Sequence, residues 1–405
     1  MIGRRAPAVE VFLVFLRLGL ISFGGPIAHL GYFRSEFVER RAWLDDQSFS
    51  DLVALCQLLP GPASSQLGMA IGLARAGWAG SLAAWLGFTL PSALALILFA
   101  LGLAGFSDLA QSGAIQGLKL VAVAVVAQAV WAMARTLCPD RPRAGFAIVA
   151  ALLILAAPSA GLPVALGQVV AILAAGVSGH CLLKMPGLDV VAPRDFGVSR
   201  RAGGLALLLF AVLLIGLPLW AAAVDSMLAH LVDGFYRAGA LVFGGGHVVL
   251  PLLESAVVPV GAVSDADFLA GYGAAQAVPG PLFTFAAYLG AMMAGPATGL
   301  ASSWSSGLLF LCVIFLPAFL LLIGALPFWE ILRRRPDIRS AIAGINAAVV
   351  GILLAALYDP LWTSAIRSRA DFGLALAAFG LLVVAKLSPV VVVALTAFAG
   401  WTLYR

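Results

Sequence analysis

Charged residues are scarce in this chain. Asp, Glu, Lys and Arg together make up 11% of its 405 residues, whereas hydrophobic residues make up 62% and the mean hydropathy is +1.05. A soluble globular protein carries about a quarter charged residues, so this composition excludes an ordinary soluble domain. The net charge of +5 is ordinary for a membrane protein with basic cytoplasmic loops. It gives no reason to expect a nucleic-acid partner.

The motifs of several functional classes are missing as well. The four cysteines are scattered and form no Cys-x-x-Cys pair or other metal-ligand spacing, so we interpret them as small apolar residues. No Walker A sequence occurs, which leaves ATP drive within the chain unsupported. The Gly-x-Ser-x-Gly phrase of hydrolases and the clustered ligands of metalloenzymes are also missing. We therefore expect no cofactor, no bound metal and no enzymatic activity.

Long apolar stretches are what the sequence has instead. No Asp, Glu, Lys or Arg occurs within 79–106, 144–183, 202–224, 268–329 and 372–385. A helix needs about 20 apolar residues to cross the hydrocarbon layer, and irregular backbone cannot face lipid. The alternating ten-residue strands of a β-barrel are absent. The sequence predicts an all-α multi-pass membrane protein of about 13 apolar segments.

Two short phrases occur twice, and both place helix-breaking residues inside apolar sequence. The first is Phe-Gly-Gly, at 23–25 and again at 243–245. The second begins with Gln and ends in Pro-Gly-Pro, at 57–62 and again at 276–281. Pro lacks an amide hydrogen and disfavours helix in the residue before it, and Gly permits tight turns. Breaks at matching places in two halves are typical of transporters that bind their substrate there.

These phrases divide the chain into two repeats. We predict an N-terminal repeat over 1–183, a loop and linking membrane helix over 184–225, and a C-terminal repeat over 226–405. Further matches in the same order are Arg17 with Arg237, Phe49 with Phe268, and Gly117-Leu118-Lys119 with Gly344-Ile345-Asn346. The segments beside each Pro-Gly-Pro, 49–59 with 63–75 and 266–278 with 282–294, are too short to cross a bilayer. We favour re-entrant hairpins there, with tilted full spans as the alternative.

The basic side of the membrane changes between the repeats. Arginines at 34, 40 and 41 follow the first Phe-Gly-Gly, whereas 250–267 after the second contains no Lys or Arg. Further on, 105–116 has only Asp108, while its counterpart 326–340 carries arginines at 333, 334, 335 and 339. By the positive-inside rule, the repeats are inverted in the membrane. Arg367 and Arg369 do not fit this scheme, because they fall on the predicted outer side.

The breaks predict an anion site. After each break a new helix begins, where the first amide groups lack partners and the helix dipole is positive. Four such ends at mid-membrane would form a cage of donors for a small oxyanion; the alternative is that they are kinks filled by neighbouring helices. The residues predicted to bind substrate there are Gly24, Gly25, Pro26, Gln57, Gly61, Pro62, Ser64, Ser65, Gly244, Gly245, Gly246, Gln276, Gly280, Pro281 and Thr284.

The few ionisable residues in the apolar stretches are functional candidates by default. Arg17 and Arg237 are predicted to supply positive charge to the anion, with snorkelling to the interface as the alternative. Lys119 is a further anion ligand or an ordinary anchor at a helix end. Candidates for carrying a coupling proton are His29, His247 and Glu36, with interfacial positions as the alternative.

Together the phrases resemble the chromate ion transporter family. The resemblance rests on 23–26 with His29, on 57–62, and on 243–247 with 276–281, and it covers nearly the whole chain in the family's long two-domain form. It implies proton-driven export of chromate across the bacterial inner membrane, which confers chromate resistance. Chromate is a tetrahedral dianion close to sulfate in size and shape, which agrees with a cage of donors.

Several alternatives stay open. A sulfate or other oxyanion permease would carry the same features, and a channel or a membrane enzyme acting on lipid-linked phosphate fits less readily. The expected partners are chromate or a related oxyanion, protons and membrane lipid. The glycine-rich helices would pack either within one chain or across a homodimer.

Overall fold

The computed structural model describes residues 7–105, 112–184, 197–295, 300, 302–333 and 335–404. Asp108 and Arg334, two of the predicted loop charges, lie outside these residues. The described chain is helical and contains no β-sheet. Six of its helices are long and apolar enough to cross a membrane, and shorter apolar helices accompany them. This confirms the all-α multi-pass architecture, while the number of about 13 segments stays a prediction.

The helices follow the two halves of the sequence. The first half contains α1 Ala8–Ile21, α2 Gly25–Arg34, α3 Asp46–Leu58, α4 Ala63–Gly105, α6 Gly113–Leu137, α7 Arg141–Ala156 and α8 Val164–Leu182, with a π-helix over Ser35–Arg40. The linking helix is α9 Arg200–Val224. The second half contains α10 Met227–Leu241, α11 Val249–Val257, α12 Asp265–Ala275, α13 Phe285–Met292, α14 Ser303–Ala325, α15 Trp329–Arg333, α16 Pro336–Ala356, α17 Thr363–Ala365, α18 Arg369–Val383 and α19 Pro389–Leu403. The 3-10 turns η3 Gly246–Val248 and η4 Leu282–Thr284 precede α11 and α13.

The helix α4 is sharply bent just after its first four turns. The backbone leaves the helical region at Ala76 and Gly77, and Gly77 has a φ of +65°. The two arms then lie so close that a Cβ on Gly72 would stand 2.2 Å from the carbonyl oxygen of Gly80. Only glycine allows this approach. The arm 63–75 therefore turns back on the long arm 78–105, and α3 with 63–75 forms a short hairpin, as the sequence predicted.

The helix α6 of the first half and its counterpart α16 in the second half each pack against a helix of the other half. A Cβ on Gly117 of α6 would lie 2.3 Å from the carbonyl oxygen of Thr396 in α19. Its sequence counterpart Gly344, in α16, makes the equivalent contact with α8, where a Cβ would lie 2.2 Å from the carbonyl oxygen of Ala175. Small residues allow such close backbone packing between membrane helices. The contacts between the halves are therefore reciprocal.

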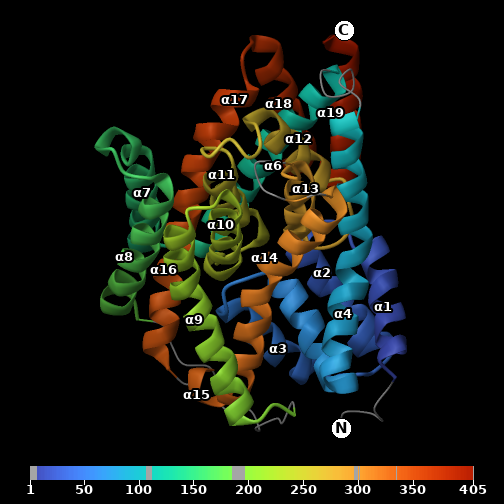
Figure 1. Cartoon of the computed structure of the whole chain (residues 1–405), viewed down its shortest axis with the longest axis vertical. Helices are drawn as coiled ribbons and strands as arrows, with labels where there is room; N and C mark the ends of the chain where they lie inside the picture. The colour runs from blue at the N-terminus through green and yellow to red at the C-terminus, as the bar shows by residue number, and fades with distance from the viewer. Residues whose placement is uncertain are drawn as a thin grey trace.

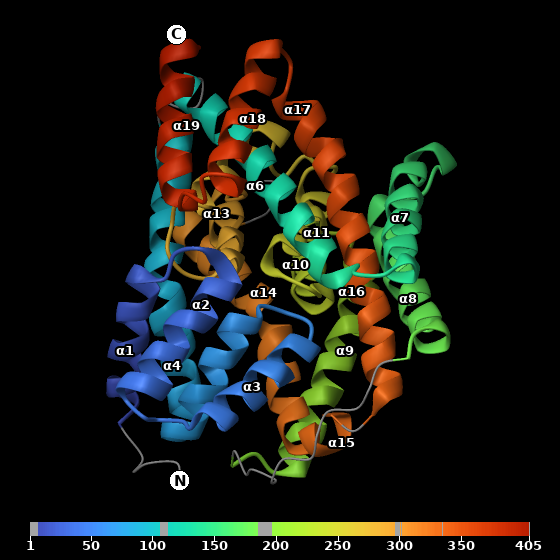
Figure 2. The ribbon, with the colours of Figure 1, turned by 180° about the vertical axis from the view of Figure 1, so that it is seen from behind.

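Matching helices of the two halves run in opposite directions. Figure 1 shows α4 rising from the lower end of the molecule, where the N-terminus lies, while α14 descends to α15 at that end. Figure 2 shows α6 descending from the upper end and α16 rising to it. The linking helix α9 is apolar and is the least buried of the six candidate membrane spans among the described residues, since only 6% of its best spanning window is buried. Such a surface requires lipid around it.

Candidate functional site at the helix breaks

Four breaks interrupt the helices near the middle of the molecule. They separate α1 from α2, α3 from α4, α10 from η3 and α12 from η4. Gly24, Gly61, Gly244 and Gly280 have φ values of +99°, +114°, +75° and +107° at these breaks. Such values favour glycine because an L-side chain is strained there. The doubled phrases thus act as the sequence predicted, and each break leaves backbone groups without helical partners.

The breaks of the two halves are joined by a reciprocal pair of hydrogen bonds. The amide of Gly61 donates to the carbonyl oxygen of Val242 at 2.7 Å, and the amide of Gly280 donates to that of Ser22 at 2.9 Å. Each Pro-Gly-Pro is therefore bonded to the residue before the Phe-Gly-Gly of the other half. All four breaks meet at one place in the molecule.

A third contact between the breaks joins Pro26 of the first half to Gly246 of the second. These are matching positions of the two repeats, and the residue types differ there. A Cβ on Gly246 would lie 3.6 Å from Cγ of Pro26 and 3.7 Å from Cβ of Leu282. Pro26 of the first half thus packs beside Gly246 of the second, next to the start of η4. By contrast, no heavy atom of the described residues lies within 4 Å of a Cβ built on Gly25. The backbone at Gly25 therefore has no close neighbour on that side among the described residues.

Several predicted donors are already engaged in the structure. The amides of Gly61 and Gly280 form the cross-half bonds, so these two residues shape the site without offering free amides. The hydroxyl of Thr284 donates to the carbonyl oxygen of Pro281 at 2.7 Å. The hydroxyl of Ser64 is 3.2 Å from Nδ1 of His29. The predicted cage therefore has fewer free donors than the sequence indicated.

Other polar atoms near the breaks have no partner among the described residues. They are buried, and they include three donors, the hydroxyls of Ser22 and Ser65 and Nε2 of Gln276, together with one acceptor, Oδ1 of Asn346. No side chain of the described residues caps the helix starts after Gly24, Gly245 and Pro281. A buried donor without a partner is costly, so a bound acceptor is the expected compensation. The free donors are hydroxyl, amide and backbone groups, which suit an oxyanion.

His29 connects the two breaks of the first half. Its Nε2 lies 3.1 Å from the carbonyl oxygen of Ser22 and donates to it, which leaves Nδ1 to accept from the hydroxyl of Ser64 in the neutral ring. The carbonyl oxygen of Ser22 therefore receives both this bond and the amide of Gly280. His247 bonds through Nδ1 to the hydroxyl of Tyr272 at 2.7 Å. Both histidines lie inside the protein and not at its rim.

A basic cavity reaches the breaks from the end of the molecule that contains α15. It has a volume of about 430 Å³ and lies between α3, α6, α7 and α16. Its lining includes Gln57, Asn346, Arg143 and Arg339. Asn346 Oδ1 would lie 3.5 Å from a Cβ on Gly244, so the cavity extends to the second Phe-Gly-Gly. We refer to this space as the basic cavity.

The mouth of the basic cavity carries an ion pair. Arg143 is bonded to Asp140 at the start of α7, with Nη2 and Oδ2 2.5 Å apart. These hydrogen bonds hold the pKa of the Asp140 carboxyl below its usual value. Because Asp140 offsets the charge of Arg143, the positive potential at the lining is smaller than its two arginines alone would give.

Comparison with known proteins agrees with this geometry. A model of the chromate transporter family matches residues 9–180 and, a second time, residues 229–401. The chain belongs to the chromate transporter family. A chromate transport protein of Pseudomonas aeruginosa is 28% identical over 98% of this chain and 92% of its own length. A chromate transport protein of Cupriavidus metallidurans is 26% identical over 98% of this chain and 93% of its own length. An uncharacterised transporter of Methanocaldococcus jannaschii is 26% identical over 86% of this chain and 83% of its own length. No solved structure matches the chain.

Two predicted residues of this chromate transporter family member, Arg17 and Lys119, do not join the breaks. Arg17 is on the exposed face of α1 with Leu13 and Leu20, because the opposite face packs on α4. This placement does not bring Arg17 to the breaks and agrees with the alternative, in which its side chain snorkels to the interface. Lys119, near the start of α6, interacts with Asp267 across the structure and lines neither cavity described here.

Glu36 has a structural environment in the π-helix. It accepts hydrogen bonds from Arg40 at 2.7 Å and from Arg41 at 2.5 Å, and its side chain is 11% exposed. Burial alone would raise its pKa, but the bonds from Arg41 and Arg40 leave the pKa of Glu36 below its usual value. A carboxylate held by two arginines is a poor proton carrier, which favours a structural role for Glu36 over the predicted coupling role.

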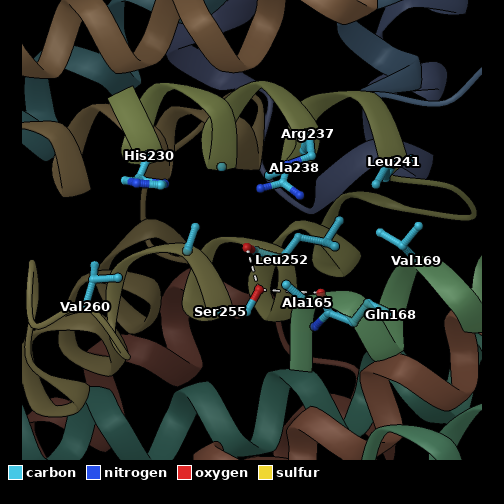
Figure 3. A pocket seen from close by; sticks show the side chains of 12 residues that line it. Ala165, Gln168, Val169, His230, Arg237, Ala238, Leu241, Leu252, Ser255 and Val260 are labelled. Atoms are coloured by element: carbon cyan, nitrogen blue, oxygen red, sulfur yellow. Dashed lines mark hydrogen bonds between the residues drawn. The ribbon is translucent and has the colours of Figure 1, made fainter. Parts of the chain in front are cut away.

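Arg237 lies in a second cavity, which Figure 3 shows between α8, α10 and α11. It forms an ion pair with Asp233, one turn earlier on α10. Asp233 is buried, with 2% of its surface exposed, and sequence reasoning did not single it out. The available signal was a lone carboxylate four residues before an arginine in an apolar helix, which is the spacing of a helical ion pair.

Proposed function

We propose that this protein is a secondary active transporter that exports chromate across the bacterial inner membrane, driven by the proton gradient, and so confers chromate resistance. The observation that carries this proposal is the junction of the four breaks. There the buried donors of Ser65 and Gln276 have no partner among the described residues, and Leu137 and Asn346, which line the basic cavity, lie beside Gly244 of the same junction. Donors without formal charge at mid-membrane suit a small anion that must both enter and leave.

The two halves also support an alternating-access cycle. Reciprocal hydrogen bonds and opposite helix directions are what two inverted repeats would produce. The packing of α12 in the second half nevertheless differs from the packing of its counterpart α3 in the first half. Three residues before Gln276, Gly273 packs on α6 so closely that a Cβ would lie 2.2 Å from the carbonyl oxygen of Leu118. Three residues before Gln57, the counterpart Ala54 lines the basic cavity instead.

This difference predicts the second state of the cycle. If α3 packs on α16 as α12 packs on α6, the basic cavity closes, and separation of α12 from α6 opens the opposite side. The junction of the breaks then faces each side in turn, and no large movement of the breaks themselves is needed. Each half would take the conformation that the other half has now.

A sulfate or other oxyanion permease is the second candidate function. The free groups at the breaks are hydroxyls and amides, which recognise a tetrahedral array of oxygen atoms and not the central atom. Chromate and sulfate would therefore compete for the same donors. The names of the relatives from Pseudomonas aeruginosa and Cupriavidus metallidurans favour chromate.

Flux measurements in vesicles test both functions. Inverted membrane vesicles containing the full chain would be given chromate outside, with and without an imposed pH gradient. Chromate uptake that rises with the gradient and falls little in the presence of excess sulfate supports the proposal. Uptake that sulfate abolishes supports a general oxyanion permease, and chromate that only equilibrates despite the gradient excludes proton coupling.

A further inference from the structure

The second cavity lies on the side of the breaks opposite to the basic cavity. Its volume is about 310 Å³, and its lining includes Leu241 at the end of α10 and Val260 in the connection from α11 to α12. Figure 1 shows α11 and this connection in the upper half of the molecule, whereas α15 beside the basic cavity lies at the lower end. We call this space the far cavity.

The far cavity contains a guanidinium with donors to spare. Figure 3 shows Arg237 and His230 on α10 facing Ser255 of α11 and Gln168 of α8 across the space. Arg237 donates through Nη2 to Asp233, and its Nε has no partner among the described residues. The guanidinium presents five N–H donors in a planar fork. The buried carboxylate therefore fixes the orientation of Arg237 and leaves part of its donor edge available.

Few other charges act on this ion pair. Within the described residues, α14 packs against α10 and contains no Asp, Glu, Lys, Arg or His. Glu254 of α11 interacts with Asp265 and Asp359 elsewhere. His230 lies one turn before the pair, and its Nε2 is 3.8 Å from Asp225 at the end of α9. Arg237 is thus the principal positive group facing the far cavity.

Both cavities end at the same helix break. Leu241 lines the far cavity and precedes Val242, whose carbonyl oxygen holds the amide of Gly61. Gly244, two residues later, is beside Leu137 and Asn346, which line the basic cavity. The segment 242–245 therefore lies between residues that line the far cavity and residues that line the basic cavity.

We propose that the far cavity is a second binding station for a tetrahedral oxyanion, in which Arg237, oriented by Asp233, holds the anion on the far side of the break. This inference rests on the proposed function, because it requires that an oxyanion crosses at the breaks. Ser255 and Gln168 border the same space, but the hydroxyl of Ser255 donates to the carbonyl oxygen of Leu252 at 3.0 Å and the side-chain amide of Gln168 donates to that of Pro251 at 3.1 Å. These two residues therefore shape the space, and Arg237 supplies the main contact to the anion. The station recognises the dianion by a bidentate guanidinium contact.

Cysteine labelling with an oxyanion as protectant tests the station. The full chain would carry serine in place of Cys56, Cys138, Cys181 and Cys312, with Ser255→Cys as the reporter. A membrane-impermeant thiol reagent would be added to right-side-out vesicles with molybdate, because chromate would itself oxidise thiols. With molybdate about tenfold above its dissociation constant, the free site falls to about a tenth, so labelling should slow about tenfold.

A double variant supplies the control. Asp233→Asn with Arg237→Gln removes both charges together and avoids leaving a buried carboxylate unpaired. It should abolish protection at Ser255→Cys. It should leave intact the protection of a second reporter, Ala54→Cys in the basic cavity, which is labelled in inverted vesicles. Where Ser255→Cys impairs chromate flux, Val260→Cys at the rim serves as the reporter instead.

The outcomes separate this inference from the proposed function. Protection at Ala54→Cys without protection at Ser255→Cys or Val260→Cys, or no labelling of the far cavity at all, overturns the second station and leaves the transporter intact. Protection at neither cavity overturns both. Protection at Ser255→Cys that survives the double variant shows that Arg237 does not hold the anion and also overturns the proposal.

Discussion

The amide of Gly61 donates to the carbonyl oxygen of Val242 at 2.7 Å, although 181 positions separate them in the sequence. Its counterpart Gly280 makes the same bond to Ser22 at 2.9 Å. Neither bond is part of a helix, and each joins a Pro-Gly-Pro of one half to a Phe-Gly-Gly of the other. The pair explains why the broken helices stay together inside a membrane, where unpaired backbone groups are costly.

Replacing Gly280 should damage this junction. Gly280→Ala places a Cβ at a φ of +107°, 2.8 Å from the hydroxyl of Ser92, so both strain and overlap result. Gly161→Ala is the matched control, since Gly161 also has a positive φ, +69°, but open space around it. Strain alone costs about 1–2 kcal/mol, so Gly280→Ala should lower the melting temperature further than the control. Equal decreases in melting temperature in the two variants would show that the junction tolerates a side chain at position 280.

Substitution of the adjacent residues Ser64 and Ser65 by alanine should affect different properties, stability in the first case and the KM for chromate in the second. Ser65→Ala removes a buried hydroxyl without a partner among the described residues, so stability should hardly change while the KM for chromate rises about tenfold from the loss of one hydrogen bond. Ser64→Ala removes the bond to His29 and should lower stability by about 1 kcal/mol. Flux kinetics and thermal unfolding measure the two effects. An unchanged KM in Ser65→Ala would remove this hydroxyl from the site.

Arg17 should be dispensable for anion binding. The sequence predicted that Arg17 supplies positive charge to the anion, but the structure places this side chain on the exposed face of α1. We expect the KM for chromate to stay within about twofold of the unaltered protein, as for other surface substitutions. A large rise in KM in a variant that inserts normally into the membrane would show that Arg17 contributes to anion binding.

The Glu36 cluster should stabilise the protein in a pH-dependent way. The pKa of Glu36 is depressed in the folded protein, so its stabilisation is present above the unfolded value of about 4.3 and is lost as the pH falls through the folded pKa. Glu36→Gln should cost about 1–3 kcal/mol at neutral pH through weaker bonds to Arg40 and Arg41. The variant and the unaltered protein should converge in melting temperature at acid pH. A constant difference down to low pH would contradict the assignment.

Ala54 tests the alternating-access cycle. Ala54→Leu fills part of the space into which α16 must move, so it should reduce chromate flux at least tenfold while binding from the basic side persists. Val53→Leu, at the neighbouring position of α3 outside the cavity lining, is the control and should retain flux. Normal flux in Ala54→Leu would mean that the basic cavity does not close in this way.

The sequence predicted the breaks well because Pro and Gly act locally. The break after Leu58, the new helix at Ala63 and the break before η4 follow from backbone chemistry that does not depend on the rest of the fold. The inversion of the repeats stays a prediction that the reciprocal packing supports.

The placement of charged side chains was harder to predict. Helices in lipid are apolar on every face, so periodicity did not show that Arg17 faces outward on α1. The partner of Arg237 was missed because Asp233 gains its importance from burial, which only the packing of α10 reveals. The bonds that occupy the amides of Gly61 and Gly280 join opposite halves and have no local signal in the sequence.

The most direct test of the central claim is the position of a bound tetrahedral anion. Tungstate, an electron-dense analogue of chromate, would be located in the structure of the full chain by its anomalous scattering. The account predicts a peak at the junction of the breaks, within hydrogen-bonding distance of the hydroxyl of Ser65 and Nε2 of Gln276. A transport-competent protein with tungstate bound only away from the breaks would contradict it.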